Sequence, residues 1–118
     1  MSKESQALLN GFQSRIEQNV NDLADFLAKR KTQYPLLELT EDDYKVLETI
    51  SLTPRQVGVL RKGLMAMGQG IVFSLLCIID GVSYVEKAIP DLAIVDRNTR
   101  KDISEQFLHD EFIGLLKD

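Results

Sequence analysis

Cysteine and histidine each occur only once in this chain of 118 residues. A single cysteine, Cys77, excludes a disulfide within the chain and any zinc site built on several thiolates. The N-terminal residues show no basic segment followed by a long apolar run, so we expect no signal peptide and a cytoplasmic location. Low-complexity stretches, internal repeats and linkers rich in Pro, Gly and Ser are also missing. We therefore expect residues 1–118 to form a single helical domain.

Positive charge is in the minority, with 14 Lys and Arg against 18 Asp and Glu and a formal net charge of −4. Binding to a phosphate backbone needs clustered Lys and Arg, so this balance argues against nucleic-acid binding as the main task. The chain is 44% hydrophobic and 27% charged, which is typical of a folded soluble protein and not of a disordered one.

The known signatures of catalysis are missing too: there is no P-loop, no GxGxxG, no HExxH and no serine elbow. Cys77 lies in the apolar stretch SLLCIID without a basic neighbour, so we interpret it as a buried thiol acting as a small hydrophobic residue. His109 is expected on the exposed face of the last helix, paired with Glu105 four residues earlier. The sequence therefore predicts no catalytic residue, no cofactor and no metal site.

Apolar residues recur at spacings of three and four, and no convincing period-two strand pattern occurs anywhere, so we predict an all-α fold of four or five helices. In the first helix the apolar positions fall within an arc of about 120°. Its basic end leads into a loop marked by Pro35. The apolar face of this helix consists of Leu8, Leu9, Phe12, Ile16, Val20, Leu23, Phe26 and Leu27.

Capping signals define the next two helices. Thr40 is a good N-cap, and the acids at 41–43 suit the positive end of a short helix better than they suit a metal ion. Thr53 as N-cap, Pro54 at the first helical position and Gln56 as the second half of a capping box begin the third helix.

The later helices are marked less clearly. The helical pattern that starts at residue 54 can run to Asp80 and end at Gly81. A short helix from Ser83 to near Pro90 should follow, and then a stretch over 90–98 that is either a short helix or a structured loop. We expect a last helix, capped at Thr99 or Asp102, that carries its apolar residues inward: Ile103, Phe107, Leu108, Phe112, Leu115 and Leu116.

Seventeen residues between Lys62 and Asp80 carry no charge. As a helix they span about 25 Å, which is shorter than the roughly 30 Å hydrocarbon layer of a bilayer. A helix that is apolar on all sides is typical of the centre of a bundle. We therefore predict a single-domain bundle of four to five helices around a central apolar helix at about 54–80, and no membrane segment.

A stripe of small side chains runs along this central helix, because its members are spaced by three or four residues. Small residues let a second backbone approach closely. The stripe either seats another helix of the same chain or crosses its own copy in a homodimer. A break in the helix at residues 68–70 (GQG) would mean that the members of the stripe no longer share one face. The candidate interaction face consists of Gly63, Ala66, Gly70, Ser74 and Cys77.

One stretch, EDDYKVLETISLTPRQVGVLRKG, reads as helix, short turn and helix, and its part LTPRQVGVLRKG resembles the opening of helix-turn-helix modules of bacterial regulators. The resemblance implies that Arg55 and Gln56 reach base edges while Arg61 and Lys62 meet phosphates. Two features depart from that pattern: the second helix continues into an apolar run, and the first begins with three acids.

We therefore expect a bacterial, cytoplasmic, non-enzymatic protein that acts through a protein partner or through self-association. The alternative is a helix-turn-helix DNA-binding regulator that uses residues 41–63.

Overall fold

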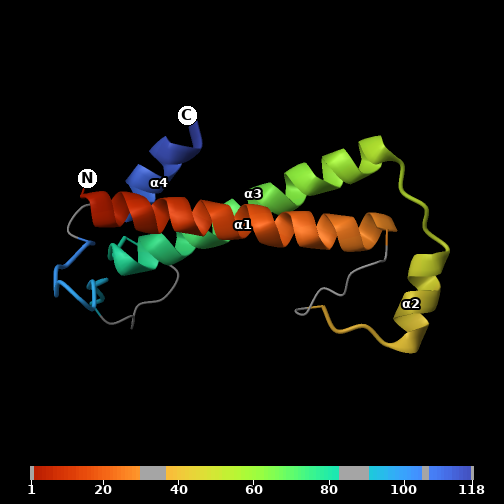
Figure 1. The fold of residues 1–118 in the computed structure, drawn as a ribbon, viewed down its shortest axis with the longest axis horizontal. Coiled ribbons are helices and arrows are strands. Elements are labelled where there is room, and N and C mark those ends of the chain that lie inside the picture. The colour runs from red at the N-terminus through yellow and green to blue at the C-terminus, as the bar shows by residue number, and fades with distance from the viewer. Residues whose placement is uncertain (1, 30–36, 83–90, 105–106, 118) are drawn as a thin grey trace. The chain divides into compact units, whose positions relative to one another are not determined.

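The computed structural model describes residues 2–29, 37–82, 91–104 and 107–117 (Figure 1). These residues contain no strand, only one isolated antiparallel bridge between Val95 and Asp102. The predicted all-α class is therefore confirmed. The short helix expected between Ser83 and Pro90 lies outside the described residues. The helices within them are α1 (Lys3–Lys29), α2 (Glu41–Glu48), α3 (Pro54–Ile79) and α4 (Leu108–Lys117).

Contacts divide the chain into two compact units, one made of Met1–Arg15 with Gly68–Asp118 and the other of Ile16–Met67. We call them unit 1 and unit 2. The boundaries fall inside α1 and α3, each of which is one unbroken helix. The core of unit 1 contains Leu9, Leu76, Leu108 and Phe112, and that of unit 2 contains Ile16, Val20, Ala24 and Phe26.

The predicted N-cap at Thr40 and the predicted capping box at Thr53 are both present in unit 2, and Thr40 also forms a capping box that was not predicted. The Thr40 hydroxyl accepts from the amide of Asp43, whose carboxylate accepts in return from the amide of Thr40. The Thr53 hydroxyl accepts from the amide of Gln56 at 3.1 Å, and the Gln56 side chain accepts from the amide of Thr53 at 2.8 Å. Helix α2 buries none of its residues. Because eight residues form only a marginal helix in water, α2 depends on the Thr40 cap and on the acidic residues of its first turn.

Helix α3 is continuous through residues 68–70, so the GQG of the sequence does not break it. It ends as predicted at Gly81, whose φ of 74° is a left-handed conformation that glycine adopts without steric cost. The Gly81 amide donates to the carbonyl of Ile78 and the Val82 amide to that of Cys77, which is the Schellman arrangement.

The predicted start of the last helix is wrong, because Thr99 and Asp102 belong to a tight polar loop and α4 begins only at Leu108. Asp96 accepts from the amides of Asn98 and Thr99, and Arg100 has a φ of 63°. These local hydrogen bonds compete with helix formation. They also hold the pKa of Asp96 below its usual range, the bond from the Thr99 amide having the largest effect.

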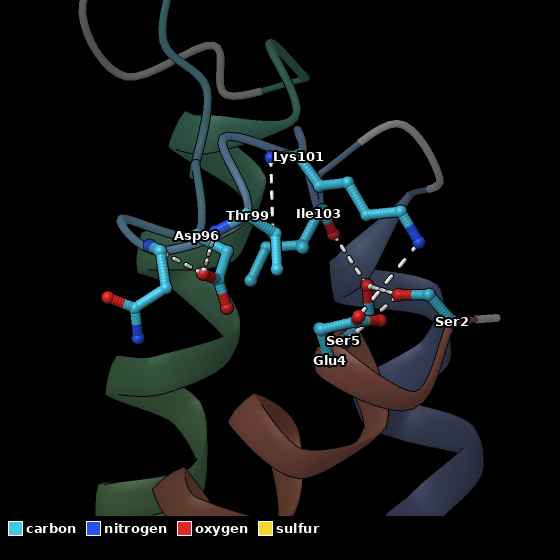
Figure 2. Close-up of polar contacts among 8 residues, drawn as sticks. Ser2, Glu4, Ser5, Asp96, Thr99, Lys101 and Ile103 are labelled. Carbon is cyan, nitrogen blue, oxygen red and sulfur yellow. Dashed lines mark hydrogen bonds and ion pairs between the residues drawn. The ribbon is translucent and has the colours of Figure 1, made fainter.

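The same loop is joined to the beginning of α1 (Figure 2). The Ser5 hydroxyl donates to the carbonyl of Ile103 at 2.6 Å, and Ser5 is itself buried. Lys101 lies 3.9 Å from Glu4, at the limit for an ion pair. Residues 98 positions apart in the chain thus meet in unit 1 through a single buried hydroxyl.

Replacing the α3 cap tests its role. Thr53→Ala is expected to lower the free energy of unfolding by about 1 kcal/mol, because the amide of Gln56 loses its acceptor. Urea denaturation followed by circular dichroism measures this change. Ser51→Ala, at an exposed position just before the cap, should stay within about 0.5 kcal/mol of wild type. Equal effects of the two substitutions would contradict the capping role.

Candidate functional site

The apolar helix α3 is largely exposed, which differs from the predicted central position in a bundle. Of its described residues only Leu76 is buried, while Met67 is 65%, Ile71 55% and Leu75 53% exposed. By length and composition α3 could cross a membrane, and only 6% of its most apolar window is buried. The described part of the chain thus leaves most of α3 uncovered, although it includes the 27-residue helix α1.

The stripe of small residues lies on the exposed side of α3 in both units. In unit 2 Gly63 and Ala66 are exposed, and in unit 1 Gly70 and Ser74 are exposed while Cys77 is half-buried. A Cβ atom added at Gly63 or at Gly70 would meet nothing within 4 Å. Among the described residues, no other helix of the same unit approaches Gly63 or Gly70.

In unit 1 this surface is apolar and lacks a usable donor. Gly70 and Ser74 lie beside the exposed Ile71 and Leu75 on consecutive turns of the helix. The Ser74 hydroxyl donates to the carbonyl of Gly70 at 2.9 Å, so its proton is already engaged. We call Gly70, Ile71, Ser74 and Leu75 the α3 face. Its chemistry permits contact through hydrophobic burial and close backbone approach, and it offers no group for catalysis.

A buried polar pair lies at the C-terminal end of α3. The Oδ2 atom of Asp80 accepts from the backbone amide of His109 at 2.8 Å and lies 2.6 Å from its Nδ1. The side chain of Asp80 is only 1% exposed and that of His109 14%. The other His109 nitrogen, Nε2, lies 3.4 Å from the exposed Asp110. This pair joins α4 to the end of α3 within unit 1.

The expected exposure of His109 is thus wrong, because its side chain is bonded to the buried Asp80. The expected partner, Glu105, lies outside the described residues. The imidazole also makes edge contacts with Phe73 and Phe107, each with ring centroids 5.8 Å apart. Phe107, predicted to point inward, is 58% exposed. A signal was present in the sequence: Asp80 directly follows a run of 17 uncharged residues, and a buried acid needs a hydrogen-bond partner.

Cys77 is a free thiol that is half-buried. Burial raises its pKa above the usual value, and the nearby charges of Asp80 and Asp110 raise it further. A raised pKa reduces the thiolate fraction at neutral pH, which weakens the thiol as a nucleophile. The predicted burial of Cys77 is wrong in degree, since the thiol is only half-buried.

The helix–turn–helix order of residues 41–63 is present in unit 2 as α2 and α3, and Arg55, Arg61 and Lys62 are exposed. Gln56, however, uses its side-chain carbonyl oxygen to cap α3. All three acids of the first turn of α2 are exposed as well. Across the described ranges no group of three His, Cys, Asp or Glu side chains is placed to hold a metal ion.

Comparison of the chain with protein-family models, with curated protein sequences and with solved structures gives no match.

The Asp80–His109 pair should contribute strongly to stability. Asp80→Ala is expected to lower the free energy of unfolding by about 3 kcal/mol, because two hydrogen bonds to a carboxylate are lost and buried donors stay unpaired. His109→Ala should cost less, since its backbone amide still donates to Asp80. Urea denaturation gives both values. Asp110→Asn, at 76% side-chain exposure, serves as the control and should cost under about 0.5 kcal/mol. A larger loss of stability for Asp110→Asn than for Asp80→Ala would contradict this account.

Alkylation of Cys77 by iodoacetamide tests its environment. Because the pKa of the thiol is raised, its thiolate fraction at any pH below that value is smaller than that of a free cysteine. The rate should therefore be below that of N-acetylcysteine methylamide, which lacks a free carboxylate, at pH 8, and its rise with pH should have a higher midpoint. A midpoint below that of N-acetylcysteine methylamide would show that this assignment is wrong.

Proposed function

We propose that this is a small non-enzymatic helical protein that acts by self-association through the α3 face. The observation that carries the proposal is the exposure of Ile71 and Leu75, each more than half exposed, on the most apolar of the described helices. Contiguous exposed apolar surface on a protein is typical of a contact with another molecule. The small side chains of Gly70 and Ser74 beside them favour a partner that approaches closely.

The free energy available from burying Ile71 and Leu75 supports a contact. Full burial of one large aliphatic side chain contributes about 1.5–3 kcal/mol. Ile71 and Leu75 retain roughly half of that each, because about half of each is already covered. A twofold-symmetric dimer presents the same face twice and so doubles the contribution of every residue. The partner we propose is accordingly a second copy of this chain.

A DNA-binding role for residues 41–63 is the alternative. It is supported by the exposure of Arg55, Arg61 and Lys62 near the start of α3. The acids at 41–43 and the net charge of −4 weigh against it, since both repel phosphate. Retention of the wild-type chain on heparin, lost in Arg55→Ala/Lys62→Ala, would favour this role over self-association.

Gly70→Leu tests the α3 face directly. The added side chain enters open space in a single chain, and leucine is a better helix former than glycine by about 1 kcal/mol, so the fold should persist. In a dimer the same side chain would hold the two backbones apart. We expect a dimeric wild type and a monomeric variant by light scattering, with unchanged helical circular dichroism.

Gly11→Leu is the matched control, because Gly11 is also exposed on a helix with open space around it but lies on α1. It should remain dimeric. A wild type that is monomeric at millimolar concentration would overturn the proposal. Flotation of the wild type with phosphatidylcholine vesicles, without a soluble dimer, would assign the face to lipid and contradict it as well.

A further inference from the structure

The first turns of α3, in unit 2, carry a stripe in which cations alternate with apolar residues. Arg55, Val59, Lys62 and Ala66 follow one another at spacings of four, three and four, so they lie along one side of the helix. All four are exposed, Val59 by 64%. No acidic residue occurs anywhere in α3 to offset the two charges. We call these four residues the basic stripe.

Helix α2 of the same unit has the opposite charge and is also uncovered. It buries none of its residues, and its first turn contains three acids. Val46 lies one turn after Asp42 on the same side of the helix and is 61% exposed. Tyr44, which makes an edge contact with the ring of Phe26 on α1, lies on the other side of α2. The outward side of α2 therefore combines an acid with an apolar residue, as the basic stripe combines cations with apolar residues.

These two surfaces do not pair with each other within one chain. Among the described residues, neither Asp42 nor its neighbour Glu41 forms an ion pair with a cation of the basic stripe. Gly58 and Gly63 flank the stripe on its two sides, and a Cβ atom added at either would meet nothing within 4 Å. No described element of unit 2 therefore covers the stripe, and α2 is left with an acidic, partly apolar side that faces solvent.

We propose that the acidic side of α2 from a second copy of this chain packs on the basic stripe, and that the stripe of the second copy receives α2 of the first. Charge complementarity identifies the occupant, because one chain carries both members of the pair and a copy brings both at once. A twofold axis then forms the contact twice.

The inference rests on the self-association proposed above and adds a second contact to that dimer. Exposed ion pairs alone contribute little, so the burial of Val46 against Val59 supplies affinity while the charges determine the register. Nucleic acid fits these surfaces less well, since it would gain nothing from the apolar residues and the acids of α2 would repel it.

Charge reversal on each side tests this contact, with dimerisation of the full chain measured by analytical ultracentrifugation. Arg55→Glu/Lys62→Glu and Glu41→Lys/Asp42→Lys should each weaken the dimer about tenfold, because attraction becomes repulsion at two symmetric contacts. An equimolar mixture of the two variants should form heterodimers with nearly the wild-type affinity, since each variant then meets a complementary partner. Reversals that leave the dimer unchanged, or a mixture of folded variants that dimerises no better than either alone, would overturn the proposal.

Two further variants separate a specific contact from other effects. Glu41→Gln/Asp42→Asn keeps the shape of the acids, and should weaken the dimer about threefold even if lysines in the first turn of α2 unfold that helix. Lys3→Glu/Lys117→Glu changes the net charge as much as the stripe reversal, at exposed positions outside α3, and should leave the dimer unchanged. Equal weakening by this control would show that net charge alone acts, and the proposal would be wrong.

The self-association and this second contact fail in different ways. A wild-type dimer that Gly70→Leu dissociates but that neither charge reversal weakens would leave the α3 face standing and overturn the contact between α2 and the basic stripe. A wild type that is monomeric at millimolar concentration would overturn both.

Discussion

The excess of apolar surface on α3 is the constraint on which the other features depend. Seventeen uncharged residues in succession give a helix that is apolar around its whole circumference. A helix of that kind needs neighbours on every side to be covered. In the described part of the chain each unit leaves its part of α3 mostly exposed. Hydrophobic burial that the single chain does not complete remains available to a partner.

At the C-terminal end of α3 the controlling interaction changes from hydrophobic to polar. Asp80 immediately follows the uncharged run and has a side chain that is 1% exposed, which is costly unless donors satisfy it. His109 supplies two such donors from a residue 29 positions away, and thereby determines where α4 begins its packing in unit 1. Buried polar pairs of this kind specify one arrangement more sharply than apolar contacts, which accept many.

Two surfaces of unit 1 differ in their chemistry. The α3 face has hydrophobic side chains, small residues and no usable donor, so an association through it would depend on buried area and close backbone approach. The cavity of about 330 Å³ at the C-terminal end of α3 is polar instead, because three of the described residues that line it are aspartates.

The sequence by itself determined the helices whose signals are local. The caps at Thr40 and Thr53, the glycine stop of α3 and the apolar face of α1 each follow from residues within about four positions of one another. The sequence left open whether α3 breaks at residues 68–70, and the structure shows that it is continuous. Tertiary structure alone decided that α3 is exposed, that His109 is bonded to Asp80, and that Thr99 and Asp102 form a loop. The reason is physical: burial depends on whether distant segments supply enough area, and a buried carboxylate takes whichever donor the fold brings near. The spacing of neighbouring residues determines neither the area that distant segments supply nor the donor that reaches the carboxylate.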